Sequence, residues 1–233
     1  MWGYAMLEFV NGHPNARLTR RDLDVSLGRK AFWSEFKYER GTEIFGEAEP
    51  ADYVYQITLG AVRTFQLLPD GRRQIAAFYL PGDIFGIETG DAYRFTADAI
   101  VHTTVRIAKR RSIFGEGAQE DISGTALKLI TKNLHHAENH IMLLGQQTAL
   151  EKVAAFLTEM DERLQSPNVM FLPMTRRDIA DYLGLTIETV SRTFSDFQRK
   201  GLVSVRGGQL RRKIVLLHRS KLAHMVPVQR EKV

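Results

Sequence analysis

The chain contains no cysteine among its 233 residues. Disulfides, thiolate zinc sites, cysteine-held iron–sulfur clusters and cysteine nucleophiles are therefore excluded. The sequence also has no run approaching the roughly 18 consecutive apolar residues that a membrane helix requires, so we expect no membrane partner. The N-terminus lacks a basic start followed by a long apolar stretch. We therefore expect no signal peptide and a cytoplasmic protein.

Motifs of the common enzyme classes are absent as well. There is no Walker loop, dinucleotide fingerprint, H-E-x-x-H pair or nucleophile elbow. Three acids, Asp83, Glu88 and Asp91, are close together in one region, and loop turns account for them. We expect no catalytic residue, no metal and no cofactor. An enzyme that uses these acids stays as an alternative.

Positive charge is concentrated in the last quarter of the chain. Residues 174–233 contain 13 Lys and Arg against 5 Asp and Glu, a balance of +8, whereas residues 1–173 contain 19 against 22, a balance of −3. Together they give the net charge of +5. A segregated basic region indicates a polyanionic partner.

The N-terminal half is rich in strand signals. Residues 1–25 are polar and irregular, and we interpret them as a flexible leader. In residues 26–118, the segments 53–59 and 61–67 are rich in β-branched and aromatic residues, 95–107 supplies two more strands, and glycines mark the corners. Short strands at regular spacing predict an antiparallel β-roll of the jelly-roll kind.

A helical pattern follows in residues 119–146. Apolar residues recur at spacings of 3, 4, 3, 4 and 3, as in a heptad repeat. They are Leu127, Ile130, Leu134, Ala137, Ile141 and Leu144. A narrow seam of this kind favours a dimerisation helix between identical subunits, and a helix lying on the β-roll is the alternative. A second helix is expected over 149–164.

Residues 147–233 read as a winged helix-turn-helix domain. Thr175 is a suitable N-cap for a helix that ends at Leu183, and Gly184 suits a tight turn. Thr186 can cap a second helix reaching about Lys200. The segment 201–217 predicts a β-hairpin that turns at Gly207-Gly208, the wing.

The second helix has two different sides. Val190, Phe194 and Phe197 form its apolar side, and Glu188, Ser191, Arg192 and Ser195 lie opposite, near its N-terminus. In a helix-turn-helix this end meets base edges in the major groove. Arg can donate two hydrogen bonds to guanine, and Glu can accept from cytosine. The alternative is a surface pair of Glu188 with Arg192, worth only about 0.2–0.5 kcal/mol.

Other polar side chains are placed to bind phosphates, which adds affinity without sequence information. The expected phosphate contacts are Thr175, Arg176, Thr186, Thr189, Arg206 and Arg211. A non-specific architectural DNA binder would use such contacts alone and stays as a further alternative.

The segment T-R-R-D-I-A-D-Y-L-G-L-T-I-E-T-V-S-R-T-F (175–194) resembles the helix-turn-helix of the CRP/FNR superfamily of bacterial transcription regulators. E-x-x-S-R at Glu188, Ser191 and Arg192 is the pattern of the FNR and FixK branch. Y-Q-I-T-L-G-A-V-R-T, L-P-D-G-R-R-Q-I and Y-L-P-G-D-I-F-G resemble the family's cyclic-nucleotide-binding-like β-roll. The likeness covers about residues 30–217, with its motifs in the right order.

The resemblance implies an α+β protein: an N-terminal β-roll, a long dimerisation helix and a C-terminal winged helix-turn-helix. It implies a homodimer that binds a TTGAT-N4-ATCAA-like palindrome in double-stranded DNA and contacts RNA polymerase, as an activator of low-oxygen, microaerobic or nitrogen-fixation genes. Arg192 and Glu188 would contact the central G·C pair and Ser191 an outer T. Ile187 stands where cyclic-AMP receptors carry Arg, and we include it among the base-contacting residues.

Two departures from the family concern ligands. The four cysteines of oxygen-sensing members are missing. Cyclic-AMP receptors carry Gly-Glu and then Arg-Ser or Arg-Thr, where this chain has Gly86-Ile87 and Phe95-Thr96, with Glu88 and Arg94 one position away. An effector-gated regulator that binds a small molecule or haem in the β-roll is the alternative. Its candidate haem ligands are His102, His135, His136 and His140.

Overall fold

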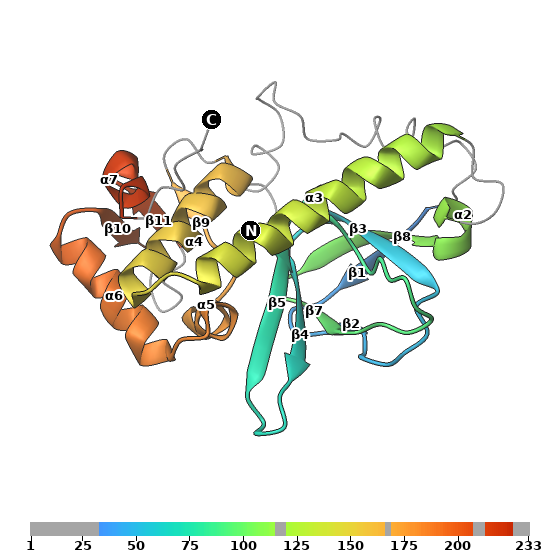
Figure 1. The fold of residues 1–233 in the computed structure, drawn as a ribbon, viewed down its shortest axis with the longest axis horizontal. Helices are drawn as coiled ribbons and strands as arrows, with labels where there is room; N and C mark the ends of the chain where they lie inside the picture. The colour runs from blue at the N-terminus through green and yellow to red at the C-terminus, as the bar shows by residue number, and fades with distance from the viewer. Residues whose placement is uncertain (1–32, 115–119, 166–168, 207–212, 226–233) are drawn as a thin grey trace.

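The computed structural model describes residues 33–114, 120–165, 169–206 and 213–225 of the chain. It is an α+β structure, as predicted, with a β-rich part and a helical part joined by one long helix (Figure 1). The leader expected over residues 1–25 lies outside the described residues. Within the described part of the chain, no helix is both long enough and apolar enough to cross a membrane.

The β-rich part consists of two four-stranded antiparallel sheets. One sheet has the order β1-β8-β3-β6, with β1 (Ser34–Tyr38), β8 (Thr103–Lys109), β3 (Tyr53–Leu59) and β6 (Ile84–Phe85). The other has the order β2-β7-β4-β5, with β2 (Glu43–Phe45), β7 (Thr96–Ala99), β4 (Val62–Leu67) and β5 (Arg73–Tyr79). The four strands expected over 53–59, 61–67 and 95–107 are all present.

Strands β3 and β4 meet at Gly60, whose φ of +91° and crowded surroundings require glycine. A Cβ added there would lie 2.5 Å from the Thr103 hydroxyl oxygen and 2.6 Å from the His102 carbonyl oxygen. Since real Cβ atoms do not approach so closely, the corner between the two sheets depends on this residue.

The long helix α3 (Glu120–Leu144) connects the two parts. Helix α2 (Arg110–Phe114) follows β8, and α3 then runs from the β-roll to the C-terminal part (Figure 1). One face of α3 is tied to the β-roll: the Lys132 ammonium lies 2.7 Å from Asp83 Oδ1, and the Asn133 amide donates to the Ile84 carbonyl at 3.2 Å. Asp83 is therefore engaged in an ion pair inside the molecule.

The C-terminal part contains α4 (Ala149–Leu164), α5 (Arg176–Leu183), α6 (Ile187–Arg199), α7 (Arg219–Ala223) and a three-stranded antiparallel sheet of order β10-β11-β9. The strands are β9 (Met170–Phe171), β10 (Val203–Arg206) and β11 (Lys213–Leu216). The turn expected at Gly207-Gly208 lies outside the described residues, but β10 and β11 pair antiparallel as a hairpin requires.

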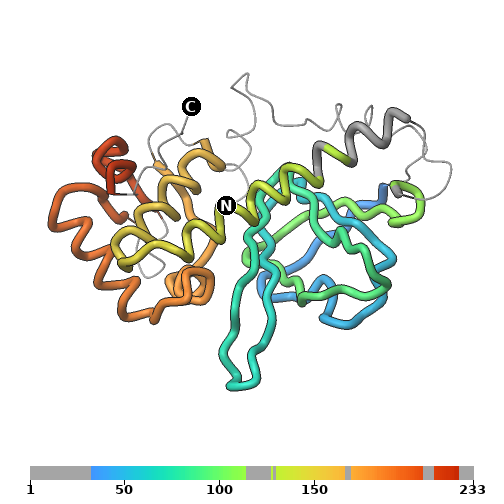
Figure 2. The backbone as a smooth tube through the Cα atoms, in the orientation of Figure 1, coloured from blue at the N-terminus to red at the C-terminus, as the bar shows by residue number. Residues whose placement is uncertain are grey.

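The two parts share one hydrophobic core. Ile75, Phe78 and Leu80 of the β-roll belong to the same buried cluster as the inner faces of α4, α5 and α6. The Phe78 ring lies 4.8 Å from the ring of Tyr182 in α5, centre to centre. Figure 2 shows the β4–β5 hairpin extending from the β-roll beside α5. The helix-turn-helix is thus packed directly against the β-roll.

Candidate nucleic-acid interface

Helix α5 begins with a reciprocal cap. The Thr175 hydroxyl accepts a hydrogen bond from the Asp178 amide at 3.2 Å, and the Asp178 carboxylate accepts one from the Thr175 amide at 2.8 Å. This capping box satisfies two amides that the first turn of a helix leaves unpaired. Ile179, Tyr182 and Leu183 are buried beneath the helix. The cap and the buried side together fix the direction of α5.

A short turn separates α5 from α6. Gly184 has φ +64° and ψ +38°, the left-handed conformation that glycine adopts without strain. The Leu185 amide donates to the Ala180 carbonyl at 3.0 Å, which closes the turn. Thr186 then caps α6 by accepting from the Thr189 amide at 3.2 Å. These local interactions set the angle between the two helices.

Helix α6 has a buried back and an exposed polar front. Val190, Phe194 and Phe197 are almost completely buried. Glu188, Ser191, Arg192 and Ser195 are exposed. The Ser195 hydroxyl donates to the Ser191 carbonyl at 3.0 Å, so it is partly committed to the helix itself. The structure therefore brings the three predicted base-contacting polar residues together on one solvent-facing surface, which we call the α6 front: Glu188, Ser191 and Arg192.

Among the described residues, Glu188 and Arg192 form no ion pair with each other. Neither side chain is engaged with another described residue, so the hydrogen-bonding groups of both are available at the surface. A guanidinium next to a carboxylate and a hydroxyl on a rigid helix can recognise a pattern of donors and acceptors on base edges. Glu188 in the first turn also lies favourably in the field of the helix N-terminus.

Ile187 and Arg176, two of the predicted DNA-contacting residues, are partly engaged inside the protein. Ile187 is half-buried and packs against the hydrophobic core, so only part of its side chain reaches the surface. The Arg176 guanidinium lies over the face of Phe194, with its carbon 3.1 Å from the ring centre. Arg176 therefore links α5 to α6 through a cation–π contact.

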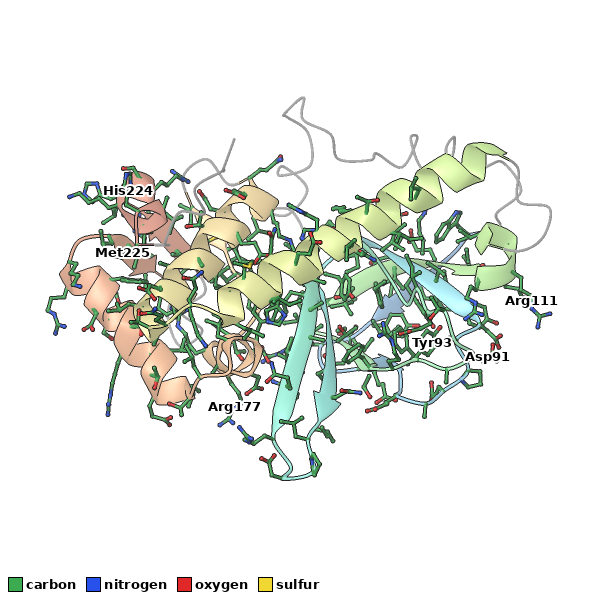
Figure 3. The ribbon with its side chains drawn as sticks, in the orientation of Figure 1. Asp91, Tyr93, Arg111, Arg177, His224 and Met225 are labelled. Carbon is green, nitrogen blue, oxygen red and sulfur yellow. The ribbon has the colours of Figure 1, made fainter. Side chains whose placement is uncertain are left out.

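The other predicted phosphate contacts that the structure describes are Thr175, Thr186, Thr189 and Arg206. Thr186 is exposed, Thr189 is half-exposed, and their hydroxyl oxygens lie 2.9 Å apart. The Thr175 hydroxyl belongs to the α5 cap. Arg206 is exposed at the end of β10, and Arg211 lies outside the described residues. Sequence reasoning missed Arg177, which is exposed in the first turn of α5 and extends away from the body of the protein (Figure 3).

Charged residues that tie the β-roll to α5 were also missed. Arg63 and Arg73, on β4 and β5, form ion pairs with Asp178 of α5, and Arg73 also pairs with Asp181. Asp178 follows Arg63 by 115 residues in the sequence, so no local sequence signal identifies the pair.

The six apolar residues of the heptad pattern on α3 are all exposed. They form a continuous surface, which we call the apolar stripe: Leu127, Ile130, Leu134, Ala137, Ile141 and Leu144. The face of α3 that contacts the β-roll is a neighbouring one, which includes Asn133 and His136. The stripe is therefore not the surface by which α3 packs on its own β-roll.

Aromatic side chains fill the interior of the β-roll. The rings of Phe45 and Tyr93 stack with centroids 3.7 Å apart, and those of Tyr55 and Phe85 stack at 5.1 Å. Burial raises the pKa of the Tyr55 hydroxyl. The Arg94 guanidinium is paired with Glu88 at 2.8 Å. These two residues, which lie one sequence position from the family's nucleotide-binding residues, thus pair with each other.

The four histidines considered as haem ligands occupy different surroundings. His102 and His135 are exposed beside Glu39 and Glu138. The His140 ring stacks on Tyr182 with centroids 3.9 Å apart, and its Nε2 lies 2.9 Å from the Tyr182 carbonyl oxygen. Burial lowers the pKa of His136 to about 4. In the part of the chain that the structure describes, no three His, Asp or Glu side chains come together as a metal site.

A β-roll joined by a long helix to a winged helix-turn-helix with an exposed polar front defines a DNA-binding transcription regulator rather than an enzyme. Comparison with known proteins agrees with this class. Residues 35–119 match the cyclic nucleotide-binding domain, and residues 151–225 match the Crp-like helix-turn-helix domain. The chain belongs to the CRP/FNR family and is a FixK/FNR-type transcription regulator.

Two relatives and one solved structure show the similarity in detail. The nitrogen fixation regulation protein FixK of Rhizobium meliloti is 42% identical over 169 residues, which cover 72% of this chain and 77% of that protein. Its namesake in Azorhizobium caulinodans is 40% identical, over 81% of this chain and 77% of that protein. The structure of FixK2 from Bradyrhizobium japonicum is 48% identical, with a TM-score of 0.79, and covers 84% of this chain and 98% of that one.

Proposed function

We propose that the chain is a homodimeric activator that binds a TTGAT-N4-ATCAA-like palindrome in double-stranded DNA. The observation that carries this proposal is the α6 front, which is rigidly backed, solvent-facing and free of an internal Glu188–Arg192 pair. In this proposal Arg192 and Glu188 contact the central G·C pair of each half-site and Ser191 contacts the outer T. Ile187 contributes only through the part of its side chain that is exposed.

Phosphate contacts orient each domain on the duplex. The residues proposed for this role are Thr175, Arg176, Thr186, Thr189, Arg206 and Arg211, joined by Arg177. The position of Arg176 over Phe194 supports a double role, because loss of its guanidinium would also loosen α5 from α6. Arg177 is exposed and makes no such contact with any described residue, so it is the cleaner probe of phosphate binding.

Two copies are proposed to meet through the apolar stripe on α3. Large exposed apolar side chains at heptad spacing gain free energy when two helices bury them against each other. The two α6 helices would then contact successive major-groove faces about 34 Å apart. Because the interior of the β-roll is filled by aromatic rings, we propose that DNA binding requires no ligand there.

The relatives named above suggest the biological setting. Two of them are called nitrogen fixation regulation proteins. We propose that this chain, acting in the cytoplasm, controls genes of low-oxygen, microaerobic or nitrogen-fixation metabolism and contacts RNA polymerase to activate them.

The decisive measurement compares the affinity of ligand-free protein for the TTGAT palindrome and for a scrambled duplex at one salt concentration. We expect a preference of at least about 10³-fold, within the range of specific DNA-binding proteins. Equal affinity for the two duplexes would contradict the proposal and favour a non-specific architectural protein.

A further inference from the structure

Five charged side chains connect the β-roll to the first helix of the helix-turn-helix. We call them the interdomain ion cluster: Arg63, Arg73, Asp98, Asp178 and Asp181. Arg73 donates to Asp181 Oδ2 from Nε at 2.9 Å and from Nη2 at 2.7 Å, and Nη2 also lies 2.7 Å from Asp178 Oδ1. Arg63 bridges Asp178 to Asp98 of β7, the latter at 2.6 Å.

Asp178 belongs both to this cluster and to the α5 cap. Its Oδ2 accepts from the Thr175 amide at 2.8 Å, while its Oδ1 accepts from Arg63 and Arg73. Burial alone would raise the pKa of this carboxyl, but the Thr175 hydrogen bonds and the two guanidinium groups outweigh it, and the pKa is lowered. The β4–β5 hairpin therefore holds α5 through Asp178, which is also the residue that caps the start of α5.

The cluster is poorly suited to be a source of stability. Its side chains are mostly buried, with Asp178 only 3% exposed and Arg63 14%. Arg63 Nε and Asp98 Oδ1 are buried without a hydrogen-bond partner among the described residues. Buried ion pairs lose hydration free energy that their attraction often fails to recover, and well-packed apolar residues can do as well. What such pairs add is a defined geometry, because several charged groups must meet at fixed positions.

Outside the cluster, other polar contacts also join the parts. Arg163 of α4 donates to the Phe78 carbonyl at 2.7 Å, and His140 Nε2 of α3 lies 2.9 Å from the Tyr182 carbonyl oxygen in the last turn of α5. Neither contact involves the first turn of α5, which the cluster holds through Asp178.

Covalently, the C-terminal part joins α3 through only the short segment 145–148. Apolar packing of Phe78 against Tyr182 resists separation of the parts but is not directional. The Phe65 ring contacts both arginines, with its centre 5.9 Å from the guanidinium carbon of Arg63 and 5.5 Å from that of Arg73.

We propose that Arg63 and Arg73 are positioning residues for DNA recognition, which hold α5, and with it α6, at the orientation that sets the spacing between half-sites. This inference rests on the proposed binding of a homodimer to a palindrome. Among the described residues, no hydrogen bond or ion pair joins the cluster to the α6 front. The cluster therefore affects how the two α6 fronts are presented together and not which bases either one selects.

The test uses full-length protein and a series of TTGAT palindromes whose half-sites are separated by three, four, five or six base pairs, with a single half-site as reference. Affinities are measured at fixed salt for wild type, Arg73→Gln and Arg73→Gln/Asp181→Asn. The double variant leaves no unpaired carboxylate at position 181, so it remains informative if the single variant folds poorly. Arg72→Gln is the matched control, because Arg72 lies on the same hairpin with a side chain 77% exposed and, among the described residues, pairs only with Asp70.

When the two DNA-binding domains of a dimer lose their fixed geometry, the effective concentration of the second domain at its half-site falls. The affinity then depends less on the spacing between half-sites. We therefore expect wild type and Arg72→Gln to prefer one spacing by about 30-fold or more, and the Arg73 variants by less than about 5-fold, with half-site affinity changed by less than about 2-fold.

An unchanged spacing preference in folded Arg73 variants overturns the positioning role and leaves the proposed function intact. So does a loss of half-site affinity in proportion to the loss of full-site affinity, since that marks a damaged domain. If wild type itself shows no preference for the palindrome over scrambled DNA, the proposed function fails and this inference fails with it.

Discussion

Truncation of two side chains in the apolar stripe tests whether α3 joins two copies of the chain. Leu134 is 57% exposed and Ile141 is 67% exposed, so more than half of each side chain remains to be buried. Full burial of a Leu or Ile is worth about 1.5–3 kcal/mol, and truncation to alanine at these exposures removes about 1 kcal/mol per side chain. Each substitution occurs twice in a dimer.

Leu134→Ala should therefore weaken dimerisation by about 2 kcal/mol, or roughly 30-fold in Kd, and Leu134→Ala/Ile141→Ala by about 4 kcal/mol, or roughly 10³-fold. Sedimentation equilibrium over a range of protein concentrations measures this constant. Met142→Ala is the control, because Met142 is 48% exposed on the same helix but outside the stripe. A dimerisation constant that is the same for wild type and the double variant would refute the assignment of the stripe as the subunit interface.

Three further predictions concern DNA binding and pH. Arg192→Ala should reduce discrimination against a changed central G·C pair by about 1–3 kcal/mol, measured by competition binding, whereas Gln198→Ala at the far end of α6 should leave it unchanged. Arg177→Ala should weaken binding to all sequences alike and reduce the slope of log K against log salt by about one, so a sequence-dependent effect would contradict a phosphate role. Because His136 has its pKa lowered to about 4 by burial, the unfolded chain binds a proton that the folded chain does not between about pH 6.5 and 4. Stability should therefore fall as pH decreases through this window, and urea unfolding at pH 7.5 and 5 should show a smaller loss for His136→Phe than for wild type.

The local features of the helix-turn-helix could be predicted from sequence. Thr175 and Thr186 cap their helices, and Gly184 takes the left-handed turn, because each of these interactions involves residues no more than a few positions apart. The spacing of Val190, Phe194 and Phe197 likewise predicts the buried back of α6. Short-range hydrogen bonds and helical periodicity are sufficient for such inferences.

Features that depend on distant contacts were not predictable in this way. The heptad spacing on α3 predicts an apolar stripe but does not distinguish a stripe that faces the β-roll from one that faces solvent; only the contacts of Lys132 and Asn133 show which face is occupied. The partner of Arg176 is Phe194 of the next helix, which sequence spacing did not suggest. The sequence alone allows several orientations of the stripe and several partners for Arg176. The packing of the helices and strands determines which one occurs.

This division between local and distant contacts has a functional consequence. In the proposed complex, base selection depends on the side chains of the α6 front, all within one turn and a half of helix. We propose that the preferred distance between half-sites depends on how α5 and α6 are held relative to α3. The contacts that hold them are the stacking of Tyr182 on His140 and the interdomain ion cluster. Because the two sets share no side chain, substitutions should separate base preference from spacing preference. A chain with an altered α6 front and an intact cluster should bind new half-sites at the original spacing.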